Sequence, residues 1–411
     1  MPYRQIQEVW LLEAAAGLYH QKGQMMKTGA TKGLNSDRLR HLKEVIATDI
    51  AEGRYLGATV IVARHGEIGL HEAIGTRRGN DPRPVEKDSV FSLFSLTKGL
   101  TNILVLRAIE LGRIALTTKV SDIIPEFAGK PRESIRIEHL LTHRTGLPSV
   151  FVPKPGMPID RLDVVIQAIC EHVHGEDEPG GKVAYSPMAA HALMGEILRR
   201  TDPDGRRFRD IVAQDLLEPL GMASTAVGVR PDLKPRHIVP EFPPAFPATH
   251  PSSNVPGPNG AFEDPEAEMP WVGMVSTASD IWRFAEMLRR GGELDGNRIV
   301  APRTLDLATR NMTGNLPNQI YKTMALGRGW PPYPAYIGLG FSLRGENICH
   351  HQFGTFATPR AFGNHGAGST LFWIDPELDM TFVCLTTRLL PEADNIERFQ
   401  RLSDIAISAA L

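Results

Sequence analysis

The sequence predicts an α+β fold, in which an antiparallel sheet is flanked by helices, and three observations support this prediction. Near the start, a helical pattern is followed by two β-branched runs joined by a tight turn. The middle of the chain has helical periodicity, and the last third returns to strand-like runs. These three parts cover residues 36–74, about 115–230 and 338–385.

The first helix and the first hairpin carry clear signals. Apolar side chains recur at spacings of three and four through residues 36–50, which is typical of an amphipathic helix. Residues 57–63 are rich in β-branched side chains, residues 64–67 form a turn, and residues 68–74 are the partner strand. A helix beside a hairpin covers one face of an antiparallel sheet.

The next stretch, Phe91–Asn102, holds the only Ser-x-x-Lys tetrad of the chain. A strand-like approach ends here, and a helical apolar pattern runs from Leu96 to Leu111. Ser95 therefore lies at the start of a helix, with Lys98 on the same helix face. A serine hydroxyl becomes a good nucleophile when a nearby base takes its proton, and a buried lysine with a lowered pKa can be that base.

The remaining elements are predicted from periodicity and from turn residues. Helices are expected at 137–143, 160–173, 187–201, 207–217 and 392–410, with an amphipathic helix also at 5–20. Strands are expected at 338–343, 370–374 and 380–385. Two irregular insertions, the proline-rich 231–270 and the aromatic 311–336, are long enough to suggest a functional role.

Composition excludes several classes of protein. The chain has 411 residues, of which 42% are hydrophobic and 22% charged, as in an ordinary globular protein with a large core. A net charge of −2 argues against nucleic-acid and anionic-membrane partners. No apolar run is long enough to span a membrane. We therefore expect a small-molecule substrate, and the sequence leaves the oligomeric state open.

Cysteine usage and the N-terminus predict a cytoplasmic protein without a metal or cofactor. Cys170, Cys349 and Cys384 are scattered, which fits a reducing compartment. The N-terminus lacks the pattern of a signal peptide, although a chain that has lost its leader would look the same. His139 and His143 could form a metal pair on a short helix, but there is no His-Glu-x-x-His pattern. Phosphate-loop and dinucleotide fingerprints are also missing.

Two further stretches could complete a site around Ser95. Tyr185 stands on a loop before a predicted helix, and a phenol beside a lysine can relay a proton. Phe362–Ser369 has three glycines ahead of an apolar strand, so its backbone can approach a ligand and offer an N–H to an oxyanion. The alternatives are an ordinary core or surface tyrosine and a glycine-rich turn with a solvated His365.

Taken in order, these stretches resemble the serine β-lactamase and penicillin-binding-protein superfamily, and best its class C branch with the family VIII carboxylesterases and related transesterases. The similarity covers about residues 37–390. The matching residues are Ser95-Leu96-Thr97-Lys98 for Ser-x-x-Lys, Tyr185-Ser186-Pro187 for Tyr-x-Asn, and Asn364-His365-Gly366 for the Lys-Thr-Gly or His-x-Gly strand. Further similar stretches are Leu140–Pro148, Glu218–Met222, Met274–Asp280 and Gly338–Phe341.

The resemblance implies roles for individual residues. Ser95 would be the acylated nucleophile, Lys98 its general base and Tyr185 the proton relay. The backbone N–H groups of Ser95 and Ala367 would form the oxyanion hole. The residues expected to bind substrate are Asn364, His365, Gly366, Trp271 and Trp330.

The resemblance also implies a division into domains, with the site between two of them. Residues 1–35 would be an N-terminal extension. Residues 36–114 and 271–411 would form the sheet domain. Residues 115–270, including the proline-rich loop 231–270, would form an inserted, mostly helical domain.

Two departures from the family pattern bear on the substrate. Pro187 replaces the asparagine of Tyr-x-Asn, and Asn364 replaces the cationic or histidine residue that begins the third motif. His365 comes one position later, and a one-residue step along a strand reverses the face. The loss of a lysine removes a charge that would hold the carboxylate of a penicillin or peptide. These departures favour esters that have no carboxylate.

The sequence therefore predicts a serine hydrolase that cleaves carboxylic esters through a Ser95 acyl-enzyme, with acyl transfer to an alcohol as a second outcome. The first alternative is a β-lactamase or D-Ala-D-Ala carboxypeptidase. The second is a protein without catalytic activity that uses the cleft only for binding.

Overall fold

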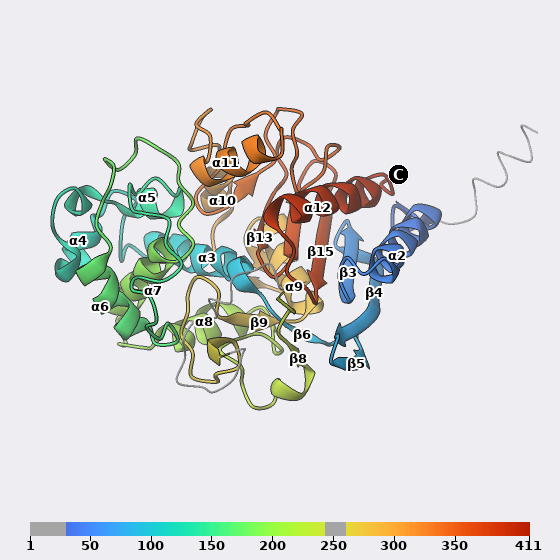
Figure 1. Ribbon diagram of the computed structural model, residues 1–411, viewed down its shortest axis with the longest axis horizontal. Coiled ribbons are helices and arrows are strands. Elements are labelled where there is room, and N and C mark those ends of the chain that lie inside the picture. The colour runs from blue at the N-terminus through green and yellow to red at the C-terminus, as the bar shows by residue number, and fades with distance from the viewer. Residues whose placement is uncertain (1–29, 243–259) are drawn as a thin grey trace, which may run out of the picture.

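The computed structural model describes residues 30–242 and 260–411, shown as a ribbon in Figure 1. The helix predicted at 5–20 and part of the proline-rich insertion lie outside the described residues. No helix in the described ranges is both long enough and apolar enough to cross a membrane.

The largest sheet has seven antiparallel strands, and with the helices around it this sheet confirms the predicted fold class. In the middle of the sheet, the hairpin predicted near the N-terminus pairs with the hairpin predicted near the C-terminus, through residues 57–64 and 380–386. In spatial order the strands are β12 (Ser342–Leu343), β13 (Phe362–Gly366), β14 (Thr370–Asp375), β15 (Met380–Thr386), β3 (Gly57–Arg64), β4 (Glu67–Arg78) and β5 (Asp81–Pro84).

Helices cover both faces of this sheet, because successive side chains of a strand point to opposite faces. Val60 and Val62 of β3 belong to the core beneath the terminal helices, whereas Ile61 belongs to the core on the other face. The terminal helices α2 (Ser36–Ala51) and α12 (Glu392–Ile407) lie side by side over the first face (Figure 1). Helix α9 (Ala278–Arg289) packs on the second face.

Helix α3 (Thr97–Glu110) lies between the sheet and the mostly helical part of the molecule (Figure 1). Most of its residues are buried, on every side of the helix, as expected for a helix inside a large protein. It contacts β13 on the sheet side and α7 on the helical side. The helical part comprises α4 (Val120–Ile123), α5 (Ile137–Leu141), α6 (Leu162–His172), α7 (Ala189–Thr201) and α8 (Phe208–Val212).

A second sheet of four short strands joins the two parts near the start of α3. Its order is β7 (Ala226–Val227), β9 (Met274–Ser276), β6 (Val90–Ser92) and β8 (His237–Ile238), and the β6–β8 pair is parallel. Strand β6 leads directly into the Ser95 turn, so this sheet fixes where α3 begins.

Two local predictions were wrong. The insertion 311–336 contains a helix, α11 (Gln319–Gly327), whose N-cap Asn318 accepts a hydrogen bond from the backbone N–H of Ile320. The strand predicted at 338–343 is reduced to β12. Its first half is bound elsewhere, because Leu339 N–H donates to Ala308 and Gly340 N–H donates to Leu141. Helix α11 matters for function, because its residue Tyr321 and its N-cap Asn318 line the candidate site.

Candidate active site

Ser95 lies in a single 3-10 turn, Phe94–Leu96, between β6 and α3. Phe94 has a φ of +51°, a left-handed conformation that is costly for a residue with a bulky side chain. Its ring would clash with a Cβ at Gly368, so the glycine-rich segment after β13 can approach the turn closely. The Ser95 side chain is half-buried, whereas its neighbours in the turn are buried.

Lys98 is one helical turn further on, and its Nζ lies 2.9 Å from Ser95 Oγ. The same Nζ donates to the backbone carbonyl of Trp271 at 2.9 Å. The lysine is only 3% exposed, and among the described residues no carboxylate acts on its charge. Burial lowers the pKa of Lys98 well below that of an ordinary lysine. A neutral amine next to a serine hydroxyl can accept its proton.

Tyr185 approaches Ser95 from the loop before α7. Its hydroxyl donates to Ser95 Oγ at 2.8 Å, and Lys98 Nζ lies 5.2 Å from the centre of its ring. Burial raises the pKa of Tyr185 above its usual value. The phenol therefore stays protonated at neutral pH. The structure thus brings the three predicted catalytic residues together around one oxygen atom.

Three hydrogen bonds join α3 to the segment that carries Trp271. Besides the Lys98–Trp271 bond, Thr101 Oγ1 donates to the Pro270 carbonyl at 2.8 Å. The N–H of Met274 donates to Thr97 Oγ1 at 3.2 Å. The position of the lysine therefore depends on segment 270–274, which is remote from it in sequence.

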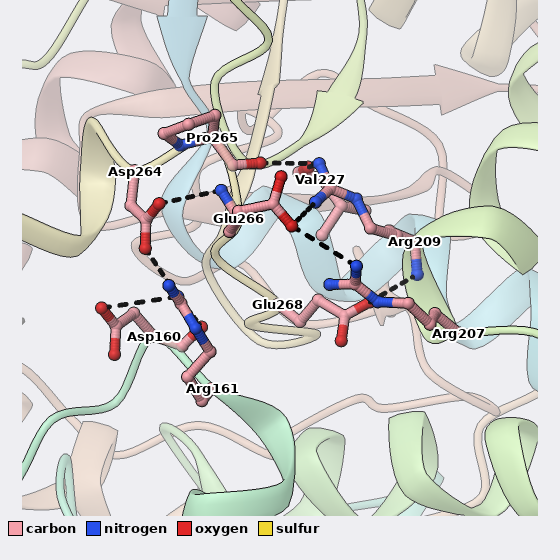
Figure 2. Close-up of polar contacts among 9 residues, drawn as sticks. All are labelled: Asp160, Arg161, Arg207, Arg209, Val227, Asp264, Pro265, Glu266 and Glu268. Atoms are coloured by element: carbon pink, nitrogen blue, oxygen red, sulfur yellow. Dashed lines mark hydrogen bonds and ion pairs between the residues drawn. The ribbon is translucent and has the colours of Figure 1, made fainter. Parts of the chain in front are cut away.

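Ion pairs hold the residues that precede this segment, as Figure 2 shows. Arg161 binds the buried carboxylate of Asp264 at 2.6 Å, and Arg209 binds Glu266 at 2.9 Å. Glu268 accepts from the N–H of Arg209 at 3.2 Å. These contacts tie residues 264–268 to the starts of α6 and α8, so the helical part of the molecule supports the environment of Lys98.

Asn364 and His365 lie on opposite faces of β13, as a one-residue step requires. Asn364 pairs across the sheet with Phe372 and faces α3, where its Oδ1 lies 2.7 Å from the position that a Cβ on Gly99 would occupy. Its Nδ2 donates to the Gly340 carbonyl at 3.2 Å, and its Oδ1 is buried without a hydrogen-bond partner. This contact explains why residue 99, within the tetrad helix, is a glycine.

His365 is held by three side chains. Its Nε2 lies 2.7 Å from a Glu392 carboxylate oxygen and 2.9 Å from the Tyr321 hydroxyl, and its Nδ1 lies 3.1 Å from the Gln352 amide nitrogen. Tyr321 also donates to Glu392 at 3.1 Å. Both ring nitrogens of His365 are therefore engaged within the protein.

One cavity connects all of these groups. Both Asn364 and His365 line it, together with Ser95, Lys98 and Tyr185. The sequence reasoning did not identify the other lining residues, which come from α3, the turn after α5, α7, the 311–342 region and the loop before β13: Asn102, His143, His191, Asn318, Tyr321, Tyr333, Ala335, Ile337, Gly340, Phe341, Ser342, His351 and Gln352. The aromatic insertion does contribute to the wall, as expected, but through tyrosines.

The remaining predicted site residues are not among those that line the cavity. Trp271 does not line the cavity with its indole, which is buried in the core, and contributes its backbone carbonyl instead. Trp330 stacks on His350, with ring centres 3.9 Å apart, outside the lining set. Gly366 packs against the Ser95 turn, where a Cβ would lie 3.0 Å from the Leu96 nitrogen, and the exposed Ala367 follows it.

The two histidines weighed as a metal pair bind backbone N–H groups instead. His139 Nδ1 accepts from Arg136 at 3.2 Å, and His143 Nδ1 accepts from Ser186 at 3.1 Å. Within residues 30–242 and 260–411, no group of three or more metal-ligating side chains is found. A nitrogen that accepts a backbone hydrogen bond has no lone pair left for a metal.

An antiparallel sheet flanked by helices, with a serine, a lysine and a tyrosine meeting at its edge, defines the class of penicillin-recognising serine proteins and their esterase relatives. The β-lactamase family model matches residues 42–407, and the chain belongs to this family.

Esterase EstB of Burkholderia gladioli is 28% identical over 66% of this chain and 74% of its own length. Penicillin-binding protein 4 of Amycolatopsis lactamdurans is 28% identical over 67% of this chain and 71% of its own length. Among solved structures, EstCE1, described as a hydrolase with promiscuous acyltransferase activity, has a TM-score of 0.73. That structure is 20% identical and covers 90% of this chain and 98% of its own, so it supports the fold alone.

Proposed function

We propose that this protein is a serine hydrolase that cleaves carboxylic esters through an acyl-enzyme on Ser95. The observation that carries the proposal is the convergence of Lys98 Nζ and Tyr185 Oη on Ser95 Oγ, at 2.9 and 2.8 Å. A buried lysine that has no carboxylate partner has a lowered pKa, which is what a general base for serine requires. The similarity to an esterase supports this reaction class.

The proposed reaction has two halves with the same proton path. Neutral Lys98 takes the proton of Ser95 as Oγ attacks the ester carbonyl, and the developing oxyanion is bound by the N–H groups of Ser95 and Ala367. Tyr185 passes a proton to the departing alkoxide, and Lys98 restores the proton of Tyr185. In the second half, a water attacks the acyl carbonyl, its proton returns along the same path, and Ser95 leaves as a hydroxyl.

The lining of the cavity supports a neutral ester as substrate. Asn364 occupies the position of the family's third-motif cation, and its amide is bound to the Gly340 carbonyl. His365 is engaged by Glu392, whose carboxylate would repel a second carboxylate nearby. Tyr321, Tyr333 and the aliphatic residues beside them provide an apolar wall. A hydrophobic wall with few charged groups suits an uncharged ester.

Acyl transfer to an alcohol is a second outcome of the same chemistry, because an alcohol can take the place of water in the deacylation half. The similarity of fold to EstCE1 makes this outcome worth testing. Whether water or an alcohol reacts faster depends on how readily each reaches the acyl group on Ser95.

Intact-protein mass spectrometry after mixing with p-nitrophenyl esters of increasing chain length tests the proposal. We expect a transient mass increase equal to the acyl group, its position mapped to Ser95, and no increase in Ser95→Ala. Faster decay in the presence of an added alcohol would indicate transfer. No adduct with any ester, together with a stable adduct from a fluorescent penicillin, would refute the ester proposal in favour of a penicillin-recognising protein.

A further inference from the structure

The stretch Leu140–Pro148 resembles the family but received no role from the sequence. In the structure, α5 ends within it and His143 follows with a φ of +52°. Left-handed backbone is uncommon for residues other than glycine, although histidine, asparagine and aspartate adopt it more often than most, and it persists where surrounding contacts enforce it. The contacts of His143 therefore hold its backbone in this conformation.

Those contacts lie on both sides of Tyr185. The backbone carbonyl of His143 accepts from the N–H of Ala184 at 2.9 Å, and its Nδ1 accepts from the N–H of Ser186 at 3.1 Å. The centre of its ring lies 4.9 Å from the centre of the Tyr185 ring. One histidine thus holds the residue before the tyrosine, the residue after it and the tyrosine ring.

The left-handed backbone makes this arrangement possible. A residue in the helical conformation would continue α5 and direct its carbonyl along the helix. At a φ of +52° the chain reverses, so that the carbonyl and the side chain of His143 can both reach the Ala184–Ser186 backbone. The two hydrogen bonds to the Ala184–Ser186 backbone therefore offset the conformational cost of the left-handed residue.

The imidazole is suited to a permanent acceptor role. Burial, reinforced by the positive charge that Lys98 can carry, lowers the pKa of His143 to about 3. Its ring neighbours, Tyr185 and His191, add no negative charge that would favour protonation. The ring stays neutral across the working pH range, with its proton on Nε2 and its Nδ1 lone pair on the N–H of Ser186.

We propose that His143 is a positioning residue. It keeps the hydroxyl of Tyr185 on Ser95 Oγ through its hydrogen bonds to the backbone N–H groups of Ala184 and Ser186. This inference rests on the proposed function, since it assumes that Tyr185 relays a proton in that reaction. Two further contacts hold the backbone of Tyr185 itself, because Asn318 Oδ1 accepts from Tyr185 N–H at 3.3 Å and Ser149 Oγ donates to the Tyr185 carbonyl at 2.7 Å.

The test begins with His143→Phe, which keeps a flat ring and removes the Nδ1 acceptor. We expect kcat for a p-nitrophenyl ester to fall roughly 10- to 100-fold with KM nearly unchanged, because a misplaced catalytic group costs rate rather than binding. His143→Asn should recover much of the loss. Its amide oxygen can accept the Ser186 N–H, and asparagine tolerates left-handed backbone.

The matched control is His139→Phe. His139 lies one turn earlier, is also 8% exposed, and also accepts a backbone N–H through Nδ1. That bond goes to Arg136, away from Tyr185. We expect this variant to lose stability comparably while keeping kcat within about two-fold of the wild type. Equal losses of kcat in the two phenylalanine variants would overturn the proposal.

A double-mutant cycle separates positioning from general support of the fold. If His143 acts through Tyr185, the kcat effect of His143→Phe should largely disappear in a Tyr185→Phe background. Additive effects would refute the inference while leaving the hydrolase proposal intact. A wild-type protein without a Ser95 adduct would instead refute the proposed function, so the two failures can be told apart.

Discussion

Two of the nitrogen bases that line the cavity, Lys98 and His365, have opposite electrostatic surroundings. Lys98 is buried against a serine and a backbone carbonyl, without a carboxylate partner among the described residues. His365 lies beside the Glu392 carboxylate, with Tyr321 and Gln352 completing its contacts. The comparison shows that one cavity can leave one base without a counter-charge and give another a carboxylate partner, and burial without a counter-charge favours the neutral amine.

The pKa of Glu392, the carboxylate partner of His365, is also changed by its surroundings. Burial alone would raise the pKa of Glu392, but the charge of His365 and its hydrogen bond lower it below the usual value. The charged carboxylate form of Glu392 is therefore favoured, whereas burial favours the neutral form of Lys98. Four predictions follow from breaking one environment or the other.

Replacement of Lys98 by methionine should have the largest effect on activity. Loss of the proposed general base should lower kcat/KM on the order of 10²- to 10⁴-fold. The pKa of Lys98 is lowered in the folded protein, so the unfolded chain binds more protons below the ordinary lysine pKa, and burial of the lysine costs stability at neutral pH. The Tm of Lys98→Met at pH 7 should therefore rise.

The control for that variant is Lys182→Met, which removes an exposed lysine paired with Asp177 close to Tyr185 in the sequence. Its activity and Tm should change little, because exposed ion pairs contribute roughly 0–1 kcal/mol. A fall in Tm for Lys98→Met would contradict the explanation based on burial.

Replacement of Asn102 by aspartate should make the surroundings of Lys98 resemble those of His365. Positions 98 and 102 are one helical turn apart, and His191 can still donate to the new carboxylate. A nearby negative charge should raise the apparent pKa of the acid limb of kcat/KM by about 1–3 units. Activity on the acid side of the profile should then fall and should recover in more alkaline solution.

The wild-type profile is the reference for this measurement. It should rise with an apparent pKa well below that of an ordinary lysine. It should not fall from ionisation of Tyr185 in the neutral range, because burial raises the pKa of that phenol. An Asn102→Asp profile that is lower at every pH, with no displacement along the pH axis, would argue for misfolding instead.

Replacement of Glu392 by glutamine should affect stability more than chemistry. A third of the Glu392 side chain is exposed (31%), and a hydrogen bond to a charged group contributes about 1.5–3 kcal/mol, so we expect the lower end of that range. The pKa of Glu392 is depressed, so its contribution is complete above the ordinary carboxyl pKa and is lost as the pH falls through the folded value. Thermal unfolding from pH 7 to pH 3 should show the two proteins converging at the acid end.

Replacement of Asp264 by asparagine should have the smallest effect. It breaks the ion pair with Arg161 in the network of Figure 2, which supports the segment leading to Trp271. Asparagine retains one acceptor, so we expect a loss of about 1 kcal/mol in unfolding free energy and a change in kcat of less than about three-fold. A larger fall in kcat with an unchanged Tm would show that this network controls Lys98 directly.

Sequence reasoning located the fold class and the centre of the site because both depend on short-range patterns. The β-branched runs of β3 and β15 and the periodic apolar residues of α2 and α3 are local signals of strand and helix. The Ser95–Lys98 spacing is itself a helical geometry, so the contact of the two side chains follows from one element. Tyr185 could be added only through the resemblance to a family.

Other parts of the site could not be obtained from local patterns. Tryptophan was expected to bind substrate, yet the Trp271 indole belongs to the core and its carbonyl contacts Lys98. Tyr321 was overlooked because α11 was expected to be irregular, although Asn318 as an N-cap ahead of apolar residues was a usable signal. Glu392 carried no signal that would connect it to His365.

By itself, therefore, the sequence determined the secondary structure around Ser95 and the reach of Lys98 to it, because residues three apart on a helix share a face. Only the tertiary structure decided which protonation state each side chain favours. The pKa of Lys98 is lowered by the surroundings that bury it, and the orientation of Tyr185 depends on His143, which lies 42 residues earlier in the chain. Burial and charge depend on neighbours that are distant in sequence, and those neighbours exist only once the chain has folded.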